Sequence, residues 1–385
     1  MPILATKETC TGCTACAAAC PQGCITMTAD ENGFLYPGVR ADRCVECGLC
    51  GRACPVLTPR QVDNAPKAYA AYSKDQGMRL QSSSGGIFTE LAKAVLAGGG
   101  VVFGAAYNER FEVVHICVDN EAELAELRGA KYAQSDLRGV FPKVKAHLEQ
   151  GRRVLFCGTP CQVGGLKAYL PKDYEELVTV DFVCHSVPSP VAWREYVKRR
   201  AAQDNGGELP LAVNLRSKET GWSRYQYSNL FRYANGKSYS AKSGESLYMK
   251  LFVGGYISRD SCTNCQFKGY SRVSDLTIGD FWGIWDIAPQ MDDNKGTSVI
   301  LAQSFRGAQL LSLIADRLVL TEVAPEEASC QNPAMLRPSA PNGRRKAALA
   351  LIRNGRLAEC GFLFAVKKPS HTRVFLQKVK GLLRM

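Results

Sequence analysis

The chain has 385 residues, a net charge of +12 and 17 cysteines. This length is sufficient for two or three domains with a large core. The N-terminus lacks the apolar stretch of a signal peptide, and no apolar run reaches the length of a membrane span. These features favour a cytoplasmic protein whose thiols stay reduced.

Two cysteine runs near the N-terminus share the spacing C-x2-C-x2-C-x3-C-P, which is typical of bacterial two-cluster ferredoxins. Zinc would favour paired C-x2-C motifs with histidine, and disulfides would need an oxidising compartment. In the ferredoxin spacing, the fourth cysteine of each run ligates the other cluster. We therefore expect one 4Fe-4S cluster on Cys10, Cys13, Cys16 and Cys54, and a second on Cys20, Cys44, Cys47 and Cys50. Cys24 is expected to be a small buried neighbour.

Four regions are predicted along the chain. Residues 1–57 form an α+β ferredoxin-like cluster domain, and the proline-rich residues 58–66 form a linker. Residues 67–330 form an α/β domain with an antiparallel insertion, and residues 331–385 form a basic helical tail.

Within the α/β domain, apolar runs alternate with amphipathic segments. We expect strands at 68–72, 101–106, 113–118, 154–157, 177–183, 276–278 and 298–302, and helices at 87–96, 140–149, 163–169, 190–202 and 308–318. The antiparallel insertion covers 213–241, where Asn235-Gly236 is a hairpin signal.

The positive charge is concentrated at the C-terminus. From Arg337 to Met385, twelve Lys and Arg stand against one acidic residue, Glu359. Residues 374–383 are expected to form a short basic amphipathic helix. This helix either packs on the body of the protein or contacts an acidic protein partner or an anionic membrane surface. Nucleic acid is not expected as a partner, because no binding module accompanies the charge.

Four further cysteines occupy positions that can meet in space. Cys161 lies in a strand-to-helix loop, Cys184 follows another strand, and Cys262 and Cys265 form a C-x2-C pair. The carboxyl ends of strands in an open α/β sheet face a common crevice, so the four thiols can form one site. Their spacing allows a third 4Fe-4S cluster or a zinc ion equally. Cys117, Cys157, Cys330 and Cys360 lack partners at ligand spacing.

Three short segments are candidates for a phosphate-binding cofactor site: Ser82 to Gly86, Gly129 to Tyr132, and Gly158 to Pro160. Small residues and hydroxyls at a helix N-terminus expose backbone N–H groups to an anion, although the serines also fit an ordinary N-cap. Together the segments suggest a dinucleotide such as FAD. The G-x-G-x-x-G fingerprint of a Rossmann site is absent.

These segments, in this order, resemble the beta subunit of coenzyme F-420-reducing hydrogenase and its relatives, over roughly residues 67 to 320. Gly158-Thr159-Pro160-Cys161-Gln162 is the most specific match. A two-cluster ferredoxin domain fused to this module is similar to the input subunit of reduced-F-420 dehydrogenases. Plant 7-hydroxymethyl chlorophyll reductase belongs to the same superfamily.

The resemblance implies FAD as the central cofactor with a 4Fe-4S cluster beside it. It assigns the third cluster to Cys161, Cys184, Cys262 and Cys265, in favour of iron–sulfur over zinc. It assigns the flavin to Ser84, Gly85, Gly86, Lys131, Tyr132, Gly158, Thr159 and Pro160.

Two regions, 279–283 and 293–298, resemble a bacterial branch of the family rather than the methanogen subunit. That branch often accompanies cell-surface polysaccharide genes, so the redox partner protein and the organic substrate stay open.

The expected function is therefore an iron–sulfur flavoprotein oxidoreductase that passes electrons between the ferredoxin domain, a third cluster and FAD. Hydride or two-electron transfer would reach coenzyme F-420 or another organic substrate. The alternatives are a non-catalytic relay subunit and a reductase of cell-surface polysaccharide biosynthesis. No catalytic residue is assigned; His185 is either a proton donor or a satisfied buried histidine, and Lys295 and Asp280 are weaker candidates.

Overall fold

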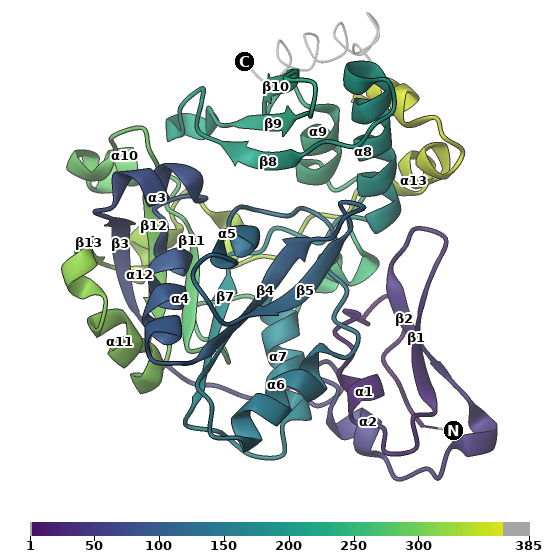
Figure 1. Cartoon of the computed structure of the whole chain (residues 1–385). Helices are drawn as coiled ribbons and strands as arrows, with labels where there is room; N and C mark the ends of the chain where they lie inside the picture. Colours follow the sequence, from purple (N-terminus) through teal and green to yellow (C-terminus); the bar gives the residue numbers. More distant parts are fainter. Residues whose placement is uncertain (1, 365–385) are drawn as a thin grey trace, which may run out of the picture.

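An eight-stranded mixed sheet forms the centre of the molecule (Figure 1). The computed structural model describes residues 2–364, and the amphipathic helix expected at 374–383 lies outside them. The strand order is β13-β3-β12-β11-β7-β6-β4-β5. The strands are β3 (Lys67–Ser73), β4 (Val101–Tyr107), β5 (Val113–Val118), β6 (Val154–Gly158), β7 (Leu177–Phe182), β11 (Leu276–Asp280), β12 (Ser298–Ala302) and β13 (Leu318–Val323).

The four strands β11, β7, β6 and β4 run parallel, and the strands outside them pair antiparallel with their neighbours. Parallel strands need crossover helices, which cover both faces of such a sheet. Their carboxyl ends meet at one edge, so loops that follow β6, β7 and β11 lie close together.

Helices cover both faces of this sheet. On one face, α4 (Ile87–Ala97) and α11 (Phe305–Ser312) pack in a core that includes Val102 and Leu155. On the other face, α6 (Val140–Glu149) and α7 (Pro160–Tyr169) pack in a core that includes Phe103 and Phe156. Neighbouring residues along a strand, such as Val102 and Phe103, thus lie in the cores on opposite faces of the sheet, because side chains alternate between the two faces of a strand.

The N-terminal cluster region is a small unit beside α6 and α7 (Figure 1). It contains α1 (Ala15–Ala18), α2 (Leu49–Arg52) and a hairpin of β1 (Ile25–Ala29) and β2 (Leu35–Val39). Its α1 packs on α7, and Cys13, Ala15 and Ala53 belong to the same apolar core as α6 and α7. The cluster region is therefore joined to the sheet domain by a continuous core.

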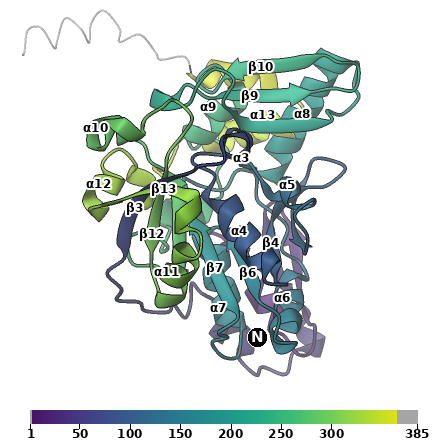
Figure 2. The same cartoon turned by 60° about the vertical axis from the view of Figure 1, so that its left-hand side comes forward.

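The antiparallel insertion is a three-stranded sheet of β8 (Ala212–Ser217), β9 (Ser228–Arg232) and β10 (Ser238–Lys242). It lies beside α8 (Pro190–Asn205), α9 (Leu247–Val253) and α13 (Arg345–Arg353), as Figure 2 shows. An aromatic core of Trp193, Tyr196, Phe231 and Tyr248 holds these elements together. The remaining helices are α3 (Gln76–Gln81), α5 (Leu124–Leu127), α10 (Ile284–Ile287) and α12 (Pro325–Ser329).

One predicted helix, 308–318, differs from the structure. Helix α11 ends at Ser312, a 3-10 turn covers Ala315–Arg317, and Leu318 begins β13. The apolar run continues through both elements, and periodicity alone cannot separate a helix from a following edge strand. Within residues 2–364, no helix has the length and hydrophobicity needed to cross a bilayer.

Candidate functional site

The four cysteines of the second set come together at the carboxyl edge of the sheet. Cys161 lies in the first turn of α7, Cys184 follows β7, and the C-x2-C pair lies at the 3-10 turn Asp260–Asn264. Burial is the main cause that raises the pKa of Cys161 to about 12, and the neighbouring charges of Cys265 and Cys184 add to it. Burial likewise raises the pKa of Cys262 to about 12, with contributions from Cys161 and Cys265. The four thiols are thus mutual neighbours.

Donors surround these sulfur atoms. The backbone N–H of Val187 donates to Cys262 Sγ at 3.3 Å, and Thr159 Oγ1 lies 3.1 Å from Cys161 Sγ. Burial raises the pKa of Cys184 to about 12, and the positive charge of Lys268 partly opposes this rise. Such donors and cations favour thiolates. Within residues 2–364, no group of three or more His, Cys, Asp or Glu side chains is arranged to hold a single metal ion.

The cysteines of the N-terminal region gather in two sets. Burial first, and then Cys13, Cys10 and Cys54, raise the pKa of Cys16 to about 12. Burial also raises the pKa of Cys50, together with Cys20 and Cys47. Cys54 therefore lies near Cys16 and Cys20 near Cys50, and the assignment of these cysteines to two clusters stays a prediction. Cys24 is buried, and its Sγ lies 3.3 Å from that of Cys20.

Helix α7 joins the first of these sets to the second group of cysteines. A Cβ on Gly165 would lie 2.8 Å from Cys13 Sγ, so the absence of a side chain lets the cluster region approach the helix. A Cβ on Gly164 would lie 2.8 Å from the Phe267 ring and 3.5 Å from Pro55 Cβ, an ordinary contact distance. Burial is the main cause that raises the pKa of Cys13 to about 12, and the charge of Cys161, four residues before Gly165, adds to it.

Arg259 ties the same two regions from the other side. Its side chain is 1% exposed. Nε donates to the carbonyl oxygen of Cys10 at 2.7 Å, Nη2 to that of Leu35 at 2.9 Å, and Nη1 to Gln134 Oε1 at 2.8 Å. The guanidinium thus spans the cluster region and the turn that carries Cys262. The sequence offers no signal for this role beyond an arginine near a C-x2-C pair.

A cavity of about 1010 Å³ opens beside the second group of cysteines. Its wall includes Cys161 and Cys184, and six of the eight residues predicted to bind flavin: Ser84, Gly86, Lys131, Tyr132, Gly158 and Thr159. Gly85 is packed against the sheet instead, since a Cβ there would lie 2.4 Å from the carbonyl oxygen of Ala71. Pro160 is buried as the first residue of α7 and is also absent from the wall.

Several buried polar atoms of wall residues have no hydrogen-bond partner within residues 2–364. They are Ser83 Oγ, His115 Nδ1, Arg128 Nε and Arg216 Nε. The first turn of α4 also reaches the cavity, and Gly86 caps it without a side-chain hydrogen bond. Buried polar groups are normally paired, so these atoms fit a polar or anionic ligand.

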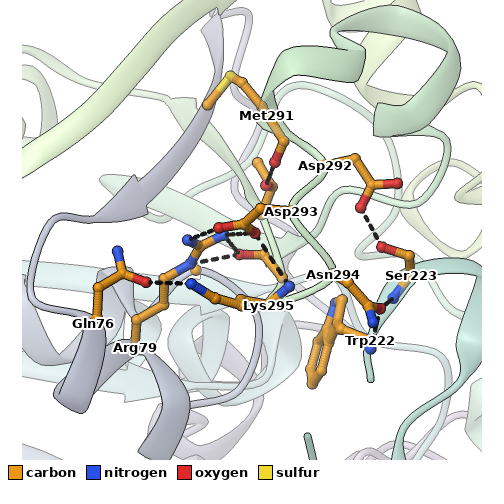
Figure 3. Close-up of polar contacts among 12 residues, drawn as sticks. Gln76, Arg79, Trp222, Ser223, Met291, Asp292, Asp293, Asn294 and Lys295 are labelled. Atoms are coloured by element: carbon orange, nitrogen blue, oxygen red, sulfur yellow. Dashed lines mark hydrogen bonds and ion pairs between the residues drawn. The ribbon is translucent and has the colours of Figure 1, made fainter. Parts of the chain in front are cut away.

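The three candidates for a catalytic role, His185, Asp280 and Lys295, lie in different environments. His185 lines the cavity and its Nε2 lies 3.1 Å from the carbonyl oxygen of Val253. Asp280 lines the cavity and forms a 2.7 Å ion pair with Arg216. Lys295 is not on the wall; its Nζ contacts Gln76 Oε1 at 3.2 Å (Figure 3).

Two further residues, Gln162 and Arg216, support the site although neither is among the residues predicted to bind the cofactor. Gln162 Oε1 accepts from the backbone N–H of Thr159 at 2.8 Å, and its Nε2 donates to Ser135 Oγ at 2.8 Å. These bonds fix the Gly158-Thr159 loop. Arg216 comes from the insertion, whose contribution to the cavity could not be foreseen from local patterns.

Comparisons with known families agree with this arrangement. The models of the coenzyme F420 hydrogenase/dehydrogenase beta subunit match residues 68–141 with their N-terminal part and 151–328 with their C-terminal part. The chain belongs to this family of beta subunits. A 4Fe-4S dicluster domain model matches residues 9–57. The predicted family is therefore confirmed, and so is a mixed α/β protein with an N-terminal ferredoxin-type cluster domain.

Individual relatives match parts of the chain in sequence. The F subunit of the F(420)H(2) dehydrogenase of Methanosarcina mazei is 27% identical over 185 residues, which are 45% of this chain and 52% of that protein. A ferredoxin of Saccharopolyspora erythraea is 41% identical over 61 residues, 16% of this chain and 52% of its own length. The chain thus spans about half the length of these two relatives.

A solved structure of the F420-reducing [NiFe] hydrogenase complex from Methanosarcina barkeri, a xenon derivative, also matches. The similarity covers 77% of this chain and 90% of that chain, with 14% identity and a TM-score of 0.47.

Proposed function

We propose that the chain is an iron–sulfur flavoprotein oxidoreductase. Cys10, Cys13, Cys16 and Cys54 would hold one 4Fe-4S cluster, and Cys20, Cys44, Cys47 and Cys50 a second. Cys161, Cys184, Cys262 and Cys265 would hold a third. The observation that carries this proposal is the contact of Cys13 with Gly165 on the helix that also bears Cys161 and leads to the cavity.

The cavity has the size and the donors for a dinucleotide. FAD is the cofactor we propose, because the unpartnered atoms on the wall and the uncapped start of α4 suit a polar ligand with phosphates. When bound, FAD supplies both one-electron exchange and two-electron or hydride transfer to an organic substrate. The residues of the chain position the ligand, and buried walls exclude water from it.

The substrate is proposed to be coenzyme F-420 or another organic molecule, and a redox partner protein is proposed at the ferredoxin end. The relative from Methanosarcina mazei is named as part of an F(420)H(2) dehydrogenase, which supports the first choice. Regions 279–283 and 293–298 resemble a bacterial branch of the family, so a different organic substrate is the alternative.

Anaerobic purification tests the proposal by composition. Three clusters require about twelve iron atoms per chain, four for each cluster. Flavin absorbance should accompany the iron. Iron near eight atoms together with zinc would contradict the third cluster, because a four-thiolate site can hold zinc instead. A protein that contains all the iron of three clusters but no flavin would instead support the alternative function, a non-catalytic electron-relay subunit.

A further inference from the structure

The positive charge of the last described segment is only partly neutralised. From Arg337 to Phe364, six Lys and Arg stand against one acid, Glu359. Three of the six form ion pairs with acids: Arg345, Arg353 and Arg356. The other three are exposed and form no ion pair within residues 2–364: Arg337, Arg344 and Lys346. Uncompensated positive charge of this kind attracts anionic partners.

Two apolar side chains are exposed in the same part of the molecule. Phe362 is 78% exposed on the 3-10 helix Leu357–Phe364, and Val253 is 57% exposed at the end of α9. Single exposed apolar residues are common on protein surfaces. Their position beside unpaired cations is therefore the informative feature.

Hydrogen bonds hold the cations and the apolar side chains on one surface. The hydroxyl of Tyr256, which follows α9, donates to the carbonyl oxygen of Leu363 at 3.4 Å. Arg344 Nη1 donates to the same carbonyl oxygen, and Asn342 Nδ2 donates to that of Gly254 at 2.5 Å. The segment before α13 thus joins the end of α9 to the 3-10 helix. Figures 1 and 2 show α9 and α13 at one end of the molecule, away from α6.

This surface borders the cavity. Lys250 and Val253 are exposed residues of α9, and both belong to the cavity wall. Tyr256 and Phe364 belong to the wall as well, and their rings lie 5.1 Å apart. One rim of the cavity is therefore continuous with the exposed cations and apolar side chains.

The combination of groups fits a lipid surface. Anionic headgroups attract exposed Lys and Arg, and aromatic side chains insert at the boundary between headgroups and acyl chains. A ring as exposed as that of Phe362 enters a fluid interface without needing a matching pocket. The sequence after Phe364 adds six further Lys and Arg and no acid. Within residues 2–364 no helix is suited to cross a bilayer, so the contact would be peripheral.

We propose that this surface docks the protein on an anionic membrane. The docking surface consists of Lys250, Val253, Arg344, Lys346 and Phe362. The cations bind the headgroups, and the apolar side chains lie in the interface. The inference goes beyond the proposed function, because it names a partner surface that involves none of the proposed cluster ligands.

Co-sedimentation of the full chain with vesicles tests the inference. Vesicles of phosphatidylcholine with about 30% phosphatidylglycerol present an anionic surface of the kind that attracts basic segments. The protein should bind them at about 0.1 M salt and be largely released at about 0.5 M, because salt screens exposed charges. Pure phosphatidylcholine vesicles should bind at least about tenfold more weakly. Equal binding to both vesicles, or binding to neither, would overturn the inference.

A pair of matched variants tests the apolar part of the surface. Phe362→Ser should weaken binding to the anionic vesicles about tenfold, the effect of losing one inserted aromatic ring. Phe305→Ser is the control, because that ring is 77% exposed on α11, outside the docking surface, and its loss should leave binding unchanged. Equal effects of the two changes would contradict the assignment.

A second pair tests the cations. Arg344→Gln with Lys346→Gln should weaken binding about tenfold or more, since each cation at an anionic surface contributes to the attraction. Lys143→Gln with Lys172→Gln removes two exposed cations from α6 and from the loop after α7, and should leave binding nearly unchanged.

Charge and local structure are separated by a third variant. Arg344→Lys with Lys346→Arg keeps both charges and should bind like the parent. Full binding by the neutral double variant, or loss of binding in the charge-preserving one, would contradict the role of these charges.

Poly-aspartate distinguishes a membrane from an acidic protein. Binding of this polymer by a chain that does not bind the anionic vesicles would overturn the inference in favour of an acidic protein partner. Iron and flavin content of the same preparations separate the inference from the proposed function. A chain with three clusters and flavin that ignores the vesicles contradicts the inference alone. A chain without flavin that binds them contradicts the proposed function alone.

Discussion

Arg259 donates a 2.7 Å hydrogen bond from its Nε to the backbone carbonyl oxygen of Cys10. The arginine lies three positions before Cys262, so one buried side chain connects the N-terminal cluster region with the second group of cysteines. The contact of Cys13 with Gly165 connects the same regions through α7. Two independent contacts therefore set the position of the ferredoxin-type domain on the larger domain.

Loss of this arginine should destabilise the protein. Arg259→Met removes three hydrogen bonds of a charged group and leaves the carbonyl oxygens of Cys10 and Leu35 unpaired. We expect a loss of about 3 kcal/mol in the free energy of unfolding. Anaerobic urea denaturation measures it. Arg194→Met, at an exposed position of α8, is the control, and an equal effect of both changes would argue against the role of Arg259.

A side chain at position 165 should disturb the same interface. Gly165→Ala would place a Cβ 2.8 Å from Cys13 Sγ, closer than van der Waals contact permits. Overpacking of this kind costs about 1–3 kcal/mol, which thermal unfolding would detect. Gly343→Ala is the matched control, because among the described residues no heavy atom beyond its chain neighbours lies within 4 Å of the added Cβ. A variant at 165 as stable as the control would contradict the close approach of the two regions.

The second group of cysteines should hold a cluster that is separable from the other two. Cys262→Ser should remove about four iron atoms and one electron paramagnetic resonance signal, and leave the two ferredoxin signals intact. Cys117→Ser serves as the control, because Cys117 is not a proposed cluster ligand. Its thiol lies 3.9 Å from His147 Nε2. Loss of all three signals in the first variant would refute the division into separate sites.

Much of this organisation follows from local patterns, and some of it does not. The strands β5 and β12 and the helix α6 have the predicted limits, because the apolar pattern of each segment marks where it begins and ends. The cysteine spacing likewise indicates the two N-terminal sets. The edge strand β13 was missed, since its pairing with β3 is decided by tertiary contacts.

The residues of the cavity wall were likewise predictable from the sequence only in part. Gly158 and Thr159 lie in a recognisable strand-to-helix loop, whereas Arg216 reaches the cavity from the separate insertion sheet. No local feature of β8 reveals this. Gly85 belongs to a segment of the right type, but close packing against β3 accounts for that glycine.

Burial of Lys131 should make stability depend on pH. Burial lowers its pKa to about 7, whereas the unfolded chain keeps the ordinary value of 10.5. Between these values the unfolded state binds more protons, so the burial of Lys131 costs stability, and this cost grows as pH falls from 10.5 to about 7 and stays constant below that. Lys131→Met should remove it.

The measurement compares the free energies of unfolding of the two flavin-free proteins from pH 7 to pH 10. The slope should be steeper in the parent by up to about 1.4 kcal/mol per pH unit. Identical slopes would show that the pKa of Lys131 is not lowered in the folded protein. Lys218, whose pKa burial also lowers to about 7, is unchanged in both proteins and cancels in the comparison.

The central claim is that the first ferredoxin cluster and the third cluster are neighbours across α7. Electron paramagnetic resonance of the fully reduced protein tests it most directly, because paramagnetic clusters that lie close together interact. We predict signals broadened or split by spin coupling, and the loss of the coupling between these two clusters in Cys262→Ser. A spectrum that equals the sum of three independent clusters, or one in which that coupling persists unchanged in the variant, would contradict the account.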